Sequence, residues 1–252
     1  MEENNTTFVT LPKAPPLPGV RFRFFQTAED YASIARLMNA TTEEMAHLYA
    51  PRPTFEPTRQ LLLAERDGKV IALAQHWWME LRDGKQLYLH THAVLPEYRG
   101  QGLEQVLLHY NERCLRVLAE QRQQVGTPVQ PHRLAWPVFL QDSEAATIAL
   151  LEREGYQPIR YNFDMLCASL EELPAAPLPA EFQLRPIEPD HYPALYVAYK
   201  EAFADAFDST PSSEEDYQRW IKRPGLQFPE LGQVAWQADQ ITGMVLCSLK
   251  QE

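Results

Sequence analysis

Three strand-like runs separated by Asp-Gly turns constrain the fold of this chain more than any other feature. Residues 59–94 read RQLLLAERDGKVIALAQHWWMELRDGKQLYLHTHAV, with Asp67-Gly68 and Asp83-Gly84 between the runs. Asp-Gly pairs tolerate the positive φ angles of tight hairpin turns, and the runs are rich in β-forming residues. The segment is therefore predicted to form an antiparallel meander.

A long helix is predicted directly after this meander. The stretch AVLPEYRGQGLEQVLLHY (93–110) passes through Pro96, Gly100 and Gly102 into a run whose apolar residues recur on one helical face. The flanking segments alternate strand 20–25, helix 27–40, strand 133–140, helix 143–156 and strand 157–168. This order predicts an α/β fold, more narrowly an α+β mixed sheet with helices on its faces, complete by about residue 170.

A Pro-rich segment divides the chain. Residues 171–181, EELPAAPLPAE, contain three prolines and almost no packing residues, as in a semi-rigid linker. Beyond it, FQLRPIEPDHYPALYVAYKEAF repeats the strand, turn and helix of residues 20–39, and GQVAWQADQITGMVLCSLKQE repeats the hairpin around Asp67-Gly68. The predicted parts are a flexible Pro-rich arm (1–19), a complete domain (20–170), a linker (171–180) and the N-terminal half of a second copy (181–252).

Composition narrows the possible partners. The 34 acidic and 23 basic residues give a net charge of −11, which argues against a surface built for nucleic acid or anionic lipid. The three cysteines lie far apart, and the sequence shows neither a signal peptide nor 18 uninterrupted apolar residues. We expect a cytoplasmic protein that binds neither nucleic acid nor membrane.

The turn before the long helix is predicted to bind an anion. A strand that passes through Gly100 and Gly102 into a helix directs unpaired backbone N–H groups and the positive end of the helix dipole at one place. Glycine lets a ligand approach the main chain closely. Such a turn suits a phosphate or pyrophosphate, although two glycines alone are equally typical of an ordinary turn.

The context of this turn resembles motif A of the GNAT acetyltransferase superfamily. Val94, Pro96, Arg99 and Gly102 occupy its pattern positions, and Gly155-Tyr156 resembles the Gly-aromatic exit of its motif B. The resemblance implies a GNAT acyltransferase fold with one complete copy and half of a second, and it implies acetyl-CoA as cofactor.

Carried over by position, the resemblance implies two groups of cofactor-binding residues. The strand end would hold the thioester carbonyl, and the backbone of the turn would bind the pyrophosphate of coenzyme A. These residues are Val94 and Leu95 at the strand end, and Arg99, Gly100, Gln101, Gly102, Leu103 and Glu104 in the turn.

Glu104 stands where the family usually has glycine or alanine. Its carboxylate could repel the pyrophosphate by about 1 to 4 kcal/mol at 4 Å, or it could point to water and stabilise the helix dipole. The motif B positions that usually carry asparagine and tyrosine fall on Glu144 and Leu151. Tyr156 or Tyr161 could then serve as the acid, if the fold brings one of them close to the site.

His90 and His92 alternate onto the strand face that carries Val94. An imidazole with a pKa near 6.5 suits a general base. The pair could instead be half-buried polar strand residues, and a metal site is disfavoured because no carboxylate or cysteine joins them at ligand spacing.

Two functions therefore compete. The first is an acetyl-CoA-dependent N-acetyltransferase, in which a primary amine of a small molecule or a protein N-terminus attacks the thioester directly. The second is a non-catalytic coenzyme A-binding or scaffold module with degenerate motifs. A half-finished second sheet would expose an edge strand, so a homodimer or docking of the two copies is expected.

Overall fold

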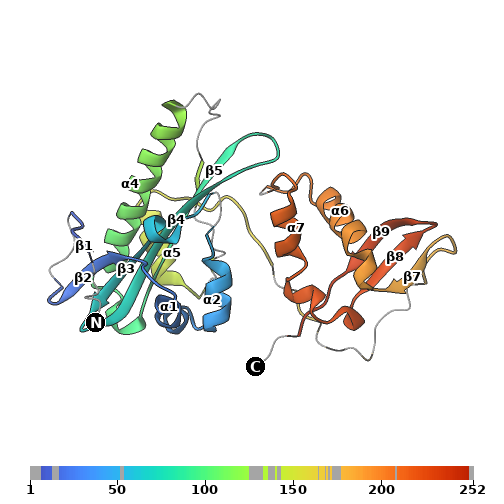
Figure 1. Cartoon of the computed structure of the whole chain (residues 1–252), viewed down its shortest axis with the longest axis horizontal. Helices are drawn as coiled ribbons and strands as arrows, with labels where there is room; N and C mark the ends of the chain where they lie inside the picture. Colours follow the sequence, from blue (N-terminus) through green and yellow to red (C-terminus); the bar gives the residue numbers. More distant parts are fainter. Residues whose placement is uncertain are drawn as a thin grey trace. The chain divides into compact units, whose positions relative to one another are not determined.

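Figure 1 shows a computed structural model of the chain, which describes residues 7–12, 17–51, 54–124, 133–135, 140, 143–163, 165–167, 169, 171, 177–207 and 209–249. The chain divides into two compact units, Met1–Asn162 and Phe163–Glu252. The narrower domain limits given above stay predictions.

The first unit alternates helices with strands. Its elements in chain order are β1 (Phe8–Val9), β2 (Val20–Phe24), α1 (Asp30–Met38), α2 (Thr42–Leu48), α3 (Pro57–Gln60), β3 (Leu61–Arg66), β4 (Lys69–Glu80), β5 (Gln86–Val94), the 3₁₀ turn η1 (Pro96–Tyr98), α4 (Leu103–Gln124), β6 (Arg133–Ala135) and α5 (Ala145–Arg153).

These strands form one mixed sheet in the order β1-β2-β3-β4-β5-β6, antiparallel except for the parallel pair β5 and β6. The predicted meander of β3, β4 and β5 is confirmed. Arg66 pairs with Lys69, and Asp67 and Gly68 between them have φ angles of 50° and 73°, as a tight turn requires. Asp83-Gly84 lies instead in a five-residue loop, because the β4–β5 pairing ends at Glu80 and Gln86.

Helices cover both faces of this sheet (Figure 1). On one face the first turns of α4 bury Leu103 and Leu107 against Ala72 and Ala74 of β4 and Val94 of β5. On the other face α1 and α2 pack on a second cluster of alternating residues. That cluster includes Ile34, Met45, Leu61, Leu63 and Leu73. The period-two burial of the strands therefore fixes which side chains lie under α4.

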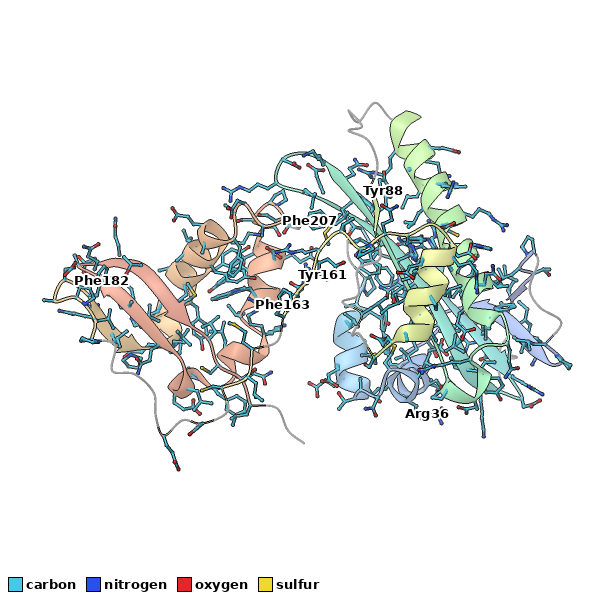
Figure 2. The ribbon with its side chains drawn as sticks, turned by 180° about the vertical axis from the view of Figure 1, so that it is seen from behind. Arg36, Tyr88, Tyr161, Phe163, Phe182 and Phe207 are labelled. Atoms are coloured by element: carbon cyan, nitrogen blue, oxygen red, sulfur yellow. The ribbon has the colours of Figure 1, made fainter. Side chains whose placement is uncertain are left out.

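Two expectations about the first unit need correction. The segment predicted to be a flexible arm contributes β1, which pairs with β2, and buries Leu11. The described residues of 157–168 form no strand, and Tyr161, Phe163 and Met165 are 73%, 84% and 96% exposed. Tyr161 and Phe163 are labelled in Figure 2. Alternation predicts a strand only where a neighbour supplies backbone partners, and β6 is the last strand of the described sheet.

The second unit is a small sheet with helices on one face. Its elements are β7 (Gln183–Pro186), the 3₁₀ turn η2 (Pro189–His191), α6 (Tyr192–Ala202), α7 (Glu214–Trp220), the 3₁₀ turns η3 (Pro224–Leu226) and η4 (Pro229–Leu231), β8 (Gln233–Gln237) and β9 (Gln240–Val245). The strands are antiparallel in the order β7-β8-β9. Leu195 of α6, Trp220 of α7 and Val234 of β8 share its core.

None of the helices in the described ranges is both long and apolar enough to cross a membrane.

Candidate functional site

The turn between β5 and α4 has the geometry of an anion-binding loop. Gly100 and Gly102 have φ angles of 71° and 89°, which L-residues adopt only at a cost of about 1–2 kcal/mol. A Cβ added at Gly100 would meet no atom within 4 Å, so the main chain is open to a ligand there. The first N–H groups of α4 have no acceptor within the helix. This turn therefore fits a phosphate group.

Glu104 already uses part of this turn. The Gly100 N–H donates to Glu104 Oε1 over 2.9 Å, so the carboxylate lies where a ligand oxygen would otherwise accept. Neither of the two predictions for Glu104 included this bond. One expected the carboxylate to repel the ligand, and the other expected it to point to water. The structure places a negative group of the protein itself in the predicted anion site.

The end of β5 is held by two further bonds. Arg99 Nε donates to the Val94 carbonyl over 2.9 Å and folds the turn back onto the strand. The Leu95 N–H donates to the Ile71 carbonyl of β4 over 2.9 Å. Because successive N–H groups alternate sides, the Val94 N–H points away from β4. Of the two predicted strand-end residues, Val94 is the one whose N–H is directed away from the β4 ladder.

The three histidines of the meander lie together under α4. His76 of β4 is paired with His90 of β5, and His92 follows on the same face as Val94. The His76 ring packs edge-on against Tyr110 of α4, with centroids 6.2 Å apart. The predicted common face of His90, His92 and Val94 is confirmed.

Burial changes the chemistry of these imidazoles. Burial lowers the pKa of His90 to about 3, with smaller contributions from His92 and His76. Burial also lowers the pKa values of His92 and His76 to about 4, and a hydrogen bond with Asn111 partly offsets the effect at His76. The expected pKa near 6.5 is wrong, because the sequence did not show that His90 has no exposed surface. A neutral His90 accepts a proton only at a high cost in free energy.

Tyr156 reaches His90 from the end of α5. Gly155 has a φ of 87° and ends the helix, and the Tyr156 N–H donates back to the Leu151 carbonyl over 2.9 Å. The Tyr156 hydroxyl then lies 2.8 Å from His90 Nε2. The structure thus brings together two of the three predicted catalytic residues, and His92 lies beside them on β5.

Glu112 of α4 completes this group, and the sequence reasoning missed it. The Tyr156 hydroxyl donates to Glu112 Oε1 over 2.8 Å, and the Glu112 side chain is 19% exposed. Burial raises the pKa of Tyr156, and Glu112 raises it further. One sequence signal could have revealed Glu112. It lies four residues after Leu108 and three before Leu115, both fully buried, so a carboxylate interrupts an apolar stripe.

A second carboxylate fixes α5 to α4. Glu154 accepts from Gln105 Nε2 and bonds His109 Nε2, each over 2.6 Å. These contacts hold the end of α5, and with it Tyr156, against α4. Leu151, which stands at the usual tyrosine position of the resembled motif, is 7% exposed and packs with Leu108. Glu144 precedes α5 and makes no side-chain cap there.

Together these groups can bind an anion near Gly100 and move a proton along hydrogen bonds from His90. Among the residues that the structure describes, no group of three or more His, Cys, Asp or Glu side chains could hold a metal ion.

Comparisons with known proteins agree with this geometry. Residues 25–121 match the model of the acetyltransferase (GNAT) family. An S-alkylcysteine N-acetyltransferase of Bacillus subtilis (strain 168) is 26% identical over 165 residues, which cover 56% of this chain and 93% of that protein. The crystal structure of a GCN5-related N-acetyltransferase from Sphaerobacter thermophilus has a TM-score of 0.57 at 23% identity, covering 96% of this chain and 74% of that chain. The matched family segment contains the turn, the histidines and Glu112.

Proposed function

We propose that this protein transfers an acetyl group from acetyl-CoA to a primary amine, because residues 25–121 match the model of the acetyltransferase (GNAT) family. The single observation that carries the proposal is the turn at Gly100 and Gly102, which is open at Gly100 and lies between β5 and α4. Acetyl-CoA supplies the activated acetyl thioester.

The turn residues Arg99, Gly100, Gln101, Gly102, Leu103 and Glu104 are proposed to hold the pyrophosphate through backbone N–H groups. The Val94 N–H, directed away from β4, is the proposed donor to the thioester carbonyl. A preorganised donor of this kind stabilises negative charge that develops on the oxygen. Leu95 contributes through its position directly after β5, since its N–H is bonded to Ile71.

The reaction requires one proton transfer that the protein has to manage. It forms a carbon–nitrogen bond and breaks a carbon–sulfur bond, one proton leaves the amine nitrogen, and the thiolate takes up one. His90, with His92 beside it, is the proposed acceptor, and Tyr156 is the proposed partner in proton movement. Positioned acid–base groups contribute about 10²- to 10⁴-fold to rates.

The acceptor is proposed to be an amine of a small molecule or a protein N-terminus. The relative from Bacillus subtilis is an S-alkylcysteine N-acetyltransferase, so the first amine panel should contain S-alkylcysteines. The cofactor-binding or scaffold module stays as the second candidate, because the bond from Gly100 to Glu104 occupies part of the cofactor turn.

Residues 181–252 are proposed to be a partial second copy of the same fold. The supporting observation is that β7, α6, α7, β8 and β9 repeat the order of β2, α1, α2, β3 and β4, apart from the short helix α3 and the 3₁₀ turns, with antiparallel pairing throughout. Both hairpins also carry a register shift, at Ala64/Glu65 and at Ala235/Trp236. In the described part of this sheet β9 is an edge strand, and homodimerisation through this edge is part of the proposal.

Calorimetric titration of the full chain with acetyl-CoA tests the function. We expect micromolar binding that is lost in Gly102→Trp, since a side chain there would be strained and would cover the turn. Circular dichroism of the variant controls for folding. Binding without acetylation of any amine in the panel would favour the second candidate, and no binding to the wild type would refute the proposed function.

A further inference from the structure

His90, Tyr156 and Glu112 form an unbroken chain of hydrogen bonds from a buried imidazole to a partly exposed carboxylate. The distances are 2.8 Å from His90 Nε2 to the Tyr156 hydroxyl and 2.8 Å from that hydroxyl to Glu112 Oε1. The three residues come from β5, the end of α5 and α4. These three residues lie too far apart in the sequence for a local pattern to predict their contact.

The direction of both bonds follows from the chemistry of the end group. A carboxylate only accepts hydrogen bonds, so the single hydrogen of the Tyr156 hydroxyl points to Glu112. The hydroxyl oxygen can then only accept from His90, which makes Nε2 the protonated nitrogen of the neutral ring. Glu112 therefore determines the tautomer of His90 without touching it.

We propose that Glu112 is a positioning residue that holds His90 in the Nε2–H tautomer through Tyr156. This inference rests on the proposed acetyl transfer for its role in catalysis. In this tautomer Nε2 donates to Tyr156, so Nδ1 is the ring nitrogen that can accept a proton.

The chain His90–Tyr156–Glu112 is a hydrogen-bond relay, because it transmits the acceptor character of Glu112 to the ring of His90. An imidazolium at this position is disfavoured because it has no exposed surface and two other histidines nearby. The ring is therefore neutral at neutral pH, and its hydrogen-bond partner decides which nitrogen carries the proton.

Other titratable groups surround the relay. They are His76 of β4, His92 of β5, Tyr110, Cys114 and Arg116 of α4, and Glu154 of α5. Arg116 lies 3.6 Å from Glu112 Oε2, and Glu154 is engaged by Gln105 and His109. Among these groups, Tyr156 is hydrogen-bonded to His90 on one side and to Glu112 on the other.

The tautomer can be measured without knowing the acceptor amine. In full-length protein with ¹⁵N-labelled histidine at neutral pH, we expect His90 to show a protonated Nε2 and an unprotonated Nδ1. Glu112→Gln keeps an acceptor oxygen for Tyr156 and should keep this tautomer, whereas Glu112→Ala frees the hydroxyl to donate to His90 and should reverse it. The controls Arg116→Ala, which removes the ion pair only, and Glu120→Ala, an exposed carboxylate of α4, should change nothing.

Activity measurements separate this inference from the proposed function. With an active amine, Glu112→Ala should lower kcat at least about tenfold with KM little changed, because acid–base catalysis contributes about 10²- to 10⁴-fold to rates. Glu112→Gln, which keeps the tautomer, should lower kcat much less. The loss should shrink as pH rises and the amine sheds its proton unaided. A protonated Nδ1 in the wild type, or no reversal in Glu112→Ala, overturns the relay even if acetyl-CoA binds and reacts. The expected tautomers without acetyl-CoA binding would refute the proposed function and leave the positioning by Glu112 established.

Discussion

The bond between Gly100 and Glu104 predicts that acetyl-CoA, the proposed cofactor, binds more weakly than the turn alone would allow. Any pyrophosphate oxygen that accepts from Gly100 has to displace a carboxylate that is now 2.9 Å from that nitrogen. Two terms oppose binding, the lost hydrogen bond and the repulsion between the displaced carboxylate and the ligand. They can be separated by substitution.

Each term has a definite size. A net hydrogen bond contributes about 1 kcal/mol, and like charges about 4 Å apart repel by about 1 kcal/mol in water and about 4 at an effective dielectric of 20. Glu104 is partly exposed, so the lower half of that range applies. Glu104→Gln removes the charge and should tighten acetyl-CoA binding about 5- to 60-fold, because 1.4 kcal/mol is a factor of ten. Glu104→Ala removes both terms and should tighten it about fivefold more.

Calorimetry of the full chain at two salt concentrations checks this reasoning. The gain in Glu104→Gln should shrink between about 0.05 and 0.5 M salt, since screening weakens the charge term. Glu120→Gln is the matched control, because it removes an exposed carboxylate of α4 about 24 Å from Glu104. If Glu104→Ala binds acetyl-CoA no tighter than the wild type, the carboxylate only caps the helix and the ligand does not use the Gly100 N–H.

Two further predictions concern stability. Burial alone would raise the pKa of Asp30, but hydrogen bonds from Arg23 and from the Gln26 and Thr27 N–H groups lower it. The pair therefore stabilises the fold above about pH 4 and is lost as pH falls through the lowered value. Asp30→Asn should cost about 3 kcal/mol at pH 7 in urea unfolding, and progressively less as pH falls below about 4; a cost that does not decrease with acidification would contradict this. Leu151→Ala should cost about 2–5 kcal/mol, since Leu151 is a core residue rather than a catalytic one; a cost below about 1 would contradict its burial.

The sequence was sufficient for features that depend on local patterns. Alternation and the Asp67-Gly68 turn predicted β3, β4 and β5, and glycine spacing predicted the turn at Gly100. Patterns could not give what depends on contacts between distant segments. The His90–Tyr156 bond joins residues 66 positions apart, and the pKa of His90 depends on burial under α4. The strand predicted at 157–168 was wrong for the same reason, since alternation carries no information about a pairing partner.

One helix carries both ends of the candidate site, and this makes the two proposals separable. Glu104 and Glu112 are eight residues apart on α4, or about 12 Å along its axis, so their substitutions should act independently. Glu104→Gln should change the dissociation constant of acetyl-CoA and leave the His90 tautomer alone, and Glu112→Ala should do the reverse. In the double variant both effects should add within about 0.5 kcal/mol. A larger deviation would mean that the turn and the relay are coupled through a movement of α4, and neither residue could then be assigned a local role.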